Sequence, residues 1–240
     1  MDWVVDCDSY YFGFGLSGEK YENSILYATG ASSIYQYRAV DSEIKWLKKQ
    51  NLLFDFGMEN FRIPETMSTF HEVKSKSIFS IGNSWTASTF AEQNKVVSLP
   101  GLVFGEPFFH VKNSGDNLIW IGSKGILHKG LHIAAKVAAS LKKRLIVVGV
   151  SNSEFGTAKA ILEFFKCEYT IFSYIDMMSK EWSDISSTCS ICLGCSISEG
   201  MSTSLLTALN AGIMPISFES CGLDVGIIIH IDDKDERVDK

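Results

Sequence analysis

Two kinds of hydrophobic pattern alternate along the second half of the chain. Short apolar runs such as Leu145–Val148 and Cys189–Gly194 are typical of strands that are buried on both faces of a parallel sheet. Longer segments lie between them, and their apolar residues recur every three or four positions, as on one face of a helix. The alternation predicts a doubly wound α/β domain. Its strands are expected at 118–121, 145–148, 169–172, 189–194 and 213–218, and its helices at 128–142, 154–165 and 177–186.

The first half of the chain shows the same alternation less regularly. Segment 102–116 contains glycines and a proline and has no periodicity, so we expect a linker there. We therefore place one α/β domain at 1–108 and a second at 109–240. Strands of the first domain are expected at 3–7, 24–29, 77–81 and 96–99, with helices at 34–50 and from 84 to about 93.

Composition and charge narrow the class of protein. The 240 residues are 46% hydrophobic, which is enough to bury a sizeable core. With a net charge of −6, the chain lacks the positive field that attracts nucleic acid, so no nucleic-acid partner is expected. The sequence shows neither a signal-peptide pattern nor an apolar run long enough for a transmembrane segment. We therefore expect a cytoplasmic protein.

Basic residues mark the predicted helix at 34–50. The favoured interpretation is that they form a solvated helix face, and the alternative is a patch that contacts an anionic membrane. The second interpretation would place the protein peripherally at the inner face of the membrane. The residues concerned are Arg38, Lys45, Lys48 and Lys49.

Three of the six cysteines follow the spacing C-x-x-C-x-x-C, at Cys189, Cys192 and Cys195. Cys221 would be available as a fourth ligand for an iron–sulfur cluster or zinc. The residues between the cysteines are mostly apolar and suit a buried strand, whereas cluster loops usually carry turn-forming residues. We therefore favour reduced, buried cysteines without iron or zinc, and a cysteine-ligated metal protein is the alternative.

Polar residues gather in the segment 198–212, which follows a predicted strand. Ser202 is expected to cap a helix there, and Gly212 is expected to end it in the left-handed conformation. The helix N-terminus, with the hydroxyls of Ser202, Thr203 and Ser204, is suited to bind a phosphate. Glu199, just before these residues, could bind sugar hydroxyls.

A second loop, at 122–130, supplies positive charge at the same edge of the predicted sheet. Lys129 lies near a predicted helix start and could reach the anion bound by the other loop, whereas Lys124 is as well explained as a solvated loop charge. His128 is interpreted as a helix-start residue and not as a base. Neither a Walker motif nor a G-x-G-x-x-G motif is present, so the sequence does not support a simple ATPase or NAD enzyme.

These segments resemble the retaining, group-one glycosyltransferases of the GT-B fold, which use nucleotide sugars. The resemblance covers most of 117–222, and a weaker one covers 24–105. It implies two Rossmann-like, doubly wound parallel-sheet domains, of which the N-terminal one lacks its start and the C-terminal one its end. The matching segments are Ile119–Ser123, His128–Leu131, Leu145–Gly149, Glu199-Gly200 and Leu205–Pro215.

The chain departs from the family's pattern at two positions. The family has two glutamates separated by seven residues; the first falls on Glu199, but the second falls on Thr207. The family's phosphate-binding arginine and lysine fall on Ser123 and Lys129, so the arginine is missing. Lys124 could replace the arginine, and Thr207 could still form one hydrogen bond to a ribose.

By this resemblance, the chain is expected to move a sugar from a nucleotide-sugar donor to a saccharide or lipid-linked acceptor, without a metal or other cofactor, in polysaccharide or glycoconjugate biosynthesis. Lys129 would stabilise the leaving diphosphate and Glu199 would orient the sugar, which makes them the candidate catalytic residues. An inactive nucleotide-sugar-binding remnant, or an interaction module, is the alternative. The expected donor-binding residues are Ser123, Lys124, Gly200, Met201, Ser202, Thr203, Ser204 and Thr207, with Tyr174 and Ile175 near the base.

Overall fold

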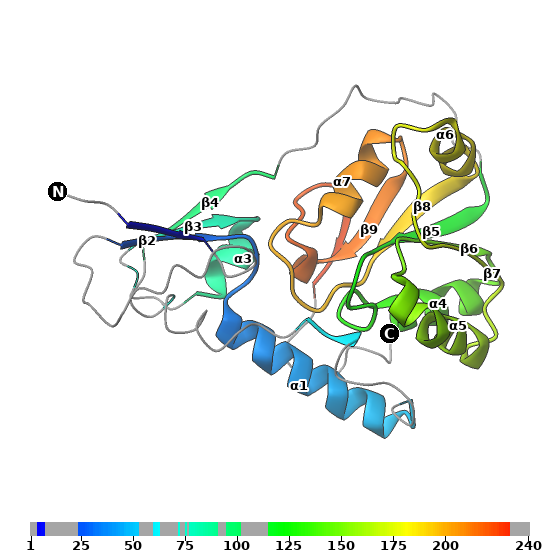
Figure 1. Ribbon diagram of the computed structural model, residues 1–240, viewed down its shortest axis with the longest axis horizontal. Helices are drawn as coiled ribbons and strands as arrows, with labels where there is room; N and C mark the ends of the chain where they lie inside the picture. The colour runs from blue at the N-terminus through cyan, green and yellow to red at the C-terminus, as the bar shows by residue number, and fades with distance from the viewer. Residues whose placement is uncertain are drawn as a thin grey trace.

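The chain forms two parallel β-sheets, which lie side by side in the computed structural model (Figure 1). One sheet belongs to the first half of the sequence and the other to the second half. The predicted boundary between residues 108 and 109 falls outside the described part of the chain, so the division into two domains stays a prediction. The structure describes residues 4–7, 24–52, 60–62, 72, 75, 77–90, 95–101 and 115–230.

The larger sheet has six strands in the order β10-β9-β8-β5-β6-β7, and every pairing in it is parallel. From β5 the chain winds outward through β6 and β7, then returns to the other side of β5 and winds outward through β8, β9 and β10. This change of direction between β5 and β8 is the place where doubly wound sheets bind ligands. The strands are β5 (Asn117–Ile121), β6 (Leu145–Val148), β7 (Tyr169–Phe172), β8 (Cys189–Gly194), β9 (Met214–Phe218) and β10 (Ile227–Ile229).

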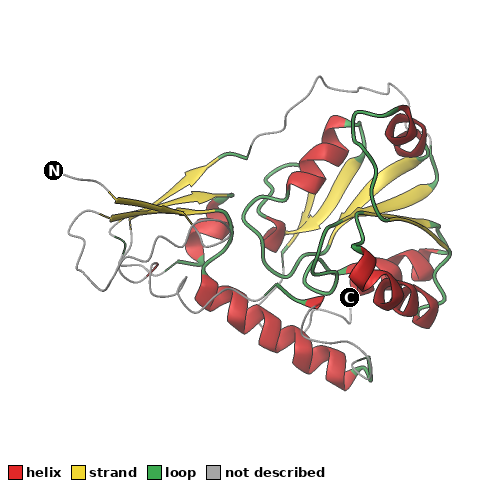
Figure 2. Ribbon diagram, in the orientation of Figure 1, coloured by secondary structure: helices red, strands yellow, loops and turns green. Residues whose placement is uncertain are grey.

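Helices cover both faces of this sheet, α4 (Leu131–Leu141) and α5 (Phe155–Phe164) on one face and α6 (Lys180–Ser187) and α7 (Thr203–Asn210) on the other (Figure 2). Alternate residues of β5 enter the two cores, as strand geometry requires. Leu118 and Trp120 belong to the core beneath α4 and α5, and Ile119 to the core beneath α6 and α7. The prediction of a doubly wound sheet is therefore confirmed.

The smaller sheet has the order β1-β2-β3-β4 and is also parallel. Its described core is small, with Leu26, Ala28, Ile78 and Phe90 buried together. The elements of this half are β1 (Val4–Cys7), β2 (Ser24–Ala28), α1 (Ser33–Lys49), β3 (Ser77–Ile81), α3 (Ser84–Ser88) and β4 (Lys95–Leu99).

Helix α1 leaves the smaller sheet and packs against α4 of the larger one (Figure 1). Leu47 of α1 is fully buried in the same core as Leu131 and Ala135 of α4. A buried hydrogen bond accompanies this packing, because the Glu43 carboxylate lies 2.6 Å from Nε2 of His132. The core of the larger sheet is thus completed by a helix from the first half of the sequence.

Several predicted elements differ from the structure: the helix expected from 84 to about 93 ends at Ser88, and the one expected at 177–186 begins at Lys180. The helix expected at 128–142 begins at Leu131, because Gly130 has a φ of 71° in the left-handed region and residues before it form a turn. Strand β10 was not predicted, since three residues at a sheet edge give too short an apolar run to distinguish. Two short 3-10 helices complete the second half, η2 (Asn152–Glu154) and η3 (Glu219–Cys221).

Candidate functional site

The loops after β5 and β8 contact each other at the carboxyl edge of the larger sheet. Nε1–H of Trp120 donates to the carbonyl of Lys129 at 3.0 Å, which fixes the turn before α4. A Cβ atom on Gly130 would lie 2.0 Å from the carbonyl oxygen of Cys195, so only glycine allows the turn to approach the end of β8 this closely. The amide of Ile197 then donates to the carbonyl of His128 at 3.0 Å.

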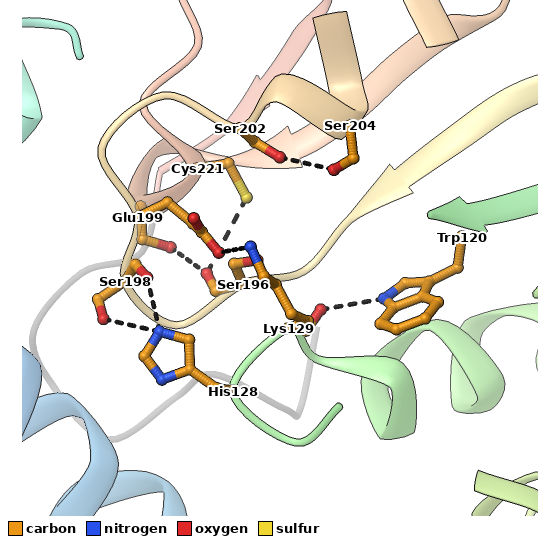
Figure 3. Close-up of polar contacts among 10 residues, drawn as sticks. Trp120, His128, Lys129, Ser196, Ser198, Glu199, Ser202, Ser204 and Cys221 are labelled. Carbon is orange, nitrogen blue, oxygen red and sulfur yellow. Dashed lines mark hydrogen bonds and ion pairs between the residues drawn. The ribbon is translucent and has the colours of Figure 1, made fainter. Parts of the chain in front are cut away.

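Lys129 and Glu199 form an ion pair where these loops meet (Figure 3). The two residues are 70 positions apart in the sequence, and each side chain is 11% exposed. Burial acts to raise the pKa of Glu199, but the charge and hydrogen bond of Lys129, with smaller contributions from His128 and Arg62, together outweigh this effect and hold the pKa below its usual value. The structure thus brings together the two residues expected to be catalytic and leaves part of each accessible.

His128 is buried beneath the loop that carries Glu199 (Figure 3). Its Nε2 lies 2.7 Å from the carbonyl oxygen of Ser198, and since a carbonyl only accepts, Nε2–H is the donor. Burial lowers the pKa of His128 from 6.5 to about 4, so the ring is neutral at pH 7. His128 is therefore a structural support for the loop, whereas the sequence suggested an ordinary helix-start residue.

Glu154 supports the 122–130 loop, a role that the sequence did not indicate. Its carboxylate is buried and accepts hydrogen bonds from the amides of Gly125 at 2.9 Å and Ile126 at 3.1 Å. The hydroxyl of Ser151 donates to the same carboxylate at 2.6 Å. An acidic residue beside a predicted helix start is common, so nothing in the local sequence distinguished this one. Glu154 holds the 122–130 loop in place from the neighbouring loop after β6.

Helix α7 begins beside the ion pair. Ser202 occupies the predicted N-cap position, but its hydroxyl lies 2.9 Å from that of Ser204 instead of bonding a backbone amide. Gly212, with a φ of 77°, follows the helix in the predicted left-handed conformation. Thr203 is exposed at the start of the helix, and the hydroxyl of Thr207 donates to its carbonyl at 2.9 Å. The hydroxyl proton of Thr207 is therefore already used within the helix. A ligand would have to displace this hydrogen bond, or donate to the hydroxyl oxygen of Thr207.

The carboxyl ends of both sheets meet at Gly200, which lies in the loop after β8. A Cβ atom on Gly200 would lie 2.2 Å from the carbonyl oxygen of Thr29 and 2.6 Å from that of Ile81, at the ends of β2 and β3. The hydroxyl of Thr86 donates to the carbonyl of Gly200 at 3.0 Å. Met201 is the next residue in the chain. The backbone amide of Gly101 donates a hydrogen bond to its Sδ atom at 3.1 Å. The loop at 199–201 is thus held between the two sheets.

The remaining predicted residues lie on other loops of the same edge. Ser123 and Lys124 are exposed in the loop that follows β5. Tyr174, beyond the end of β7, is 80% exposed, and its ring is available to a ligand. Ile175 is buried in the core beneath α6 and α7, so only its backbone is available. The roles expected for these residues stay predictions.

The cysteines that suggested a metal cluster lie on or beside β8 and are buried. Burial raises the pKa of Cys189 to about 11 and that of Cys221 to about 12, so both thiols are protonated at neutral pH. Within the described ranges, no three His, Cys, Asp or Glu side chains come together as a group that could hold a metal ion. Nor do the described helices include one with the length and apolar character needed to cross a membrane.

Solved structures with a similar fold are glycosyltransferases. Sucrose-phosphate synthase from Thermosynechococcus elongatus matches with a TM-score of 0.55 and 11% identity over 86% of this chain and 60% of that one. WaaG, a glycosyltransferase involved in lipopolysaccharide biosynthesis, matches with a TM-score of 0.52 and 14% identity over 85% of this chain and 60% of that one. The pneumococcal O-GlcNAc transferase GtfA, solved with UDP and GlcNAc, gives a TM-score of 0.50 and 12% identity over 82% of this chain and 37% of that one.

The similarity is confined to structure. No protein-family model and no curated protein matches the sequence. The chain spans 60% of the length of the first two structural neighbours and 37% of the third. Both parallel sheets, and the meeting of their carboxyl ends at Gly200, agree with the architecture expected from the sequence. The chain therefore has the GT-B fold of the glycosyltransferases.

Proposed function

We propose that the chain is a retaining hexosyltransferase, in which the second half binds the nucleotide-sugar donor and the first half holds the acceptor. It would move a sugar to a saccharide or lipid-linked acceptor in polysaccharide or glycoconjugate biosynthesis. The observation that supports it most is the Lys129–Glu199 pair, which lies at the point where the sheet reverses direction and beside the N-terminus of α7. A cytoplasmic location is part of the proposal, and the basic residues of α1 would allow contact with the inner face of a membrane that carries the acceptor.

The proposed chemistry follows from where charge develops. When the glycosidic bond to the diphosphate breaks, positive charge grows on the sugar ring and negative charge on the departing diphosphate. The Lys129 ammonium and the amides and hydroxyls at the start of α7 would stabilise the diphosphate. The Glu199 carboxylate would accept hydrogen bonds from sugar hydroxyls and hold the ring in place. No metal is needed in this scheme, because the positive groups belong to the protein.

Replacing Lys129 and Glu199 separately should affect different parts of the donor. We expect Lys129→Ala to weaken binding of a nucleoside diphosphate by about 1.5–3 kcal/mol and to leave the uncharged nucleoside unaffected, because the lysine meets the phosphates. Glu199→Ala should spare the nucleoside diphosphate and weaken only the complete nucleotide sugar. Titration calorimetry with nucleoside, nucleoside diphosphate and nucleotide sugar, each in the uridine, guanosine and adenosine series, measures these effects.

A matched control is Lys143→Ala. Lys143 pairs with Asp116 at the opposite, amino edge of the same sheet, so its replacement should change none of the affinities. Circular dichroism should show that all variants are folded, and adding EDTA should leave the affinities unchanged if no metal takes part. The assigned roles are wrong if Lys129→Ala binds the diphosphate as the wild type does, or if Glu199→Ala weakens all three ligands equally.

The second candidate function is that of a nucleotide-sugar-binding protein without transferase activity. It is favoured by Ser123 and Thr207, which stand where the family has charged residues. Release of nucleoside diphosphate over many turnovers, in the presence of a panel of saccharide and lipid-linked acceptors, would support the transferase. Tight donor binding without turnover would support the second candidate.

A further inference from the structure

Backbone carbonyls on both sides of Glu199 accept hydrogen bonds from buried side chains, one from each half of the chain. In the second half, Nε2–H of His128 donates to the carbonyl of Ser198 at 2.7 Å (Figure 3). In the first half, the hydroxyl of Thr86 donates to the carbonyl of Gly200 at 3.0 Å. His128 and Thr86 are 1% and 0% exposed, so water does not compete for either bond. The backbone is therefore held by a buried donor one residue before and one residue after the glutamate.

Helix α3 places Thr86 for this contact. Asn83 caps the helix, since its side chain accepts a hydrogen bond from the amide of Thr86 at 3.0 Å. The hydroxyl of Thr86 lies 3.3 Å from the same oxygen, but its single proton goes to the nearer acceptor, the carbonyl of Gly200. The side-chain nitrogen of Asn83 donates to the carbonyl of Leu223 at 3.3 Å. Two side chains at the start of α3 thus bind the backbone of the second half.

The carbonyl of Gly200 depends on Thr86 for its hydrogen bond. Gly200 is buried, and no second donor to this carbonyl is found in the part of the chain that the structure describes. A buried carbonyl without a donor is unfavourable, so without the hydroxyl the loop would turn towards another partner. Because the peptide unit is planar, turning this carbonyl also turns the amide of Met201 and shifts the backbone beside Glu199. The hydroxyl of Thr86 is thus suited to keep the Glu199 carboxylate facing Lys129.

We propose that Thr86 is a positioning residue for Glu199, so that the first half of the chain sets the geometry with which the second half binds the donor sugar. The inference rests on the proposed function, since it assumes that Glu199 accepts hydrogen bonds from sugar hydroxyls. It goes further because it gives a residue of the acceptor half a role in donor binding. Thr86 does not touch the donor in this scheme and acts only through the carbonyl of Gly200.

The test compares two replacements of Thr86. Thr86→Val keeps the branched shape of the side chain and removes the hydroxyl, whereas Thr86→Ser keeps the hydroxyl. The ligands are UDP, GDP and ADP with UDP-glucose, UDP-N-acetylglucosamine, GDP-mannose and ADP-glucose, measured by titration calorimetry on the full chain. We expect Thr86→Val to weaken the nucleotide sugar that binds the wild type most tightly by about 3- to 10-fold, and its nucleoside diphosphate by less than about twofold. Thr86→Ser should bind both ligands like the wild type.

Ser80→Ala is the matched control. Ser80 lies in the same half of the chain and is as buried as Thr86, but its hydroxyl has no hydrogen-bond partner among the described residues, so its loss should change no affinity. Urea denaturation shows whether each variant is folded. If Thr86→Val weakens the diphosphate as much as the nucleotide sugar, or if Thr86→Ser does not recover the affinity, Thr86 has a general structural role and the inference is overturned.

Two further outcomes separate the inference from the proposed function. If Thr86→Val binds the nucleotide sugar like the wild type while Glu199→Ala does not, the role of Thr86 is wrong and the proposed function stands. If the wild type binds none of the nucleotide sugars, both proposals fail.

Discussion

Replacing Glu43 with alanine should lower the free energy of unfolding by about 1–3 kcal/mol, the range for leaving a buried polar group without its hydrogen-bond partner. The side chains of His132 and Glu43 are 1% and 4% exposed, and the carboxylate lies 2.6 Å from the imidazole Nε2. Removing the carboxylate leaves the buried ring without this partner and opens space between α1 and α4. Urea denaturation followed by circular dichroism measures the change.

An exposed pair on the same helix provides the comparison. Asp41 and Lys45 of α1 are 64% and 72% exposed, so Asp41→Ala should cost only about 0–1 kcal/mol. Glu43→Gln, which can still hydrogen-bond to the ring, should lie between the two. If Glu43→Ala is no more destabilising than Asp41→Ala, the packing of α1 on α4 does not depend on the buried pair.

Acidification should destabilise the protein through His128. The pKa of this histidine is about 4 in the folded chain and near 6.5 when unfolded, so the unfolded chain binds the extra proton between these values. Stability contributed by the neutral ring is therefore fully present above about pH 6.5 and declines as the pH falls towards 4. The difference corresponds to a loss of up to about 3 kcal/mol. Urea denaturation at several pH values checks it.

The variant His128→Gln isolates this contribution. Glutamine can still donate to the carbonyl of Ser198 but does not titrate, so the variant should lose much less stability between pH 6.5 and 4. Glu199 contributes at lower pH, because its pKa lies below the usual value and its stabilising charge is lost only as the pH falls through it. An equally steep pH dependence in the variant and the wild type would show that another group is responsible.

The sequence was most informative where local patterns decide the structure. Runs such as Leu145–Val148 are apolar at every position because both faces of the strand are buried, and their strands were predicted to the residue. The meeting of Lys129 and Glu199 was predictable, because the carboxyl ends of parallel strands share one edge of a sheet.

Contacts between residues far apart in the sequence could not be predicted in the same way. Arg62, from the first half of the chain, packs on Gly125, and the Glu154 carboxylate accepts a hydrogen bond from the amide of Gly125, 29 positions earlier in the sequence. Neither contact leaves a periodic pattern or a motif. The helix boundary near His128 was wrong for a related reason, because the glycine at 130 is required by its contact with Cys195, which directly follows strand β8.

The packing of α1 on α4 has a consequence for how this protein can be divided. A fragment that begins after β4 would contain all six strands of the larger sheet and yet expose the surface of α4 around His132 and Lys136, which Trp46 of α1 contacts. It would also leave His132 without Glu43 and the 122–130 loop without Asn60. The part of the chain that folds stably therefore includes α1, and is not the larger sheet with its own helices alone. Domain exchange with a protein of the same fold would need to carry α1 along with the larger sheet, although α1 lies in the other half of the sequence.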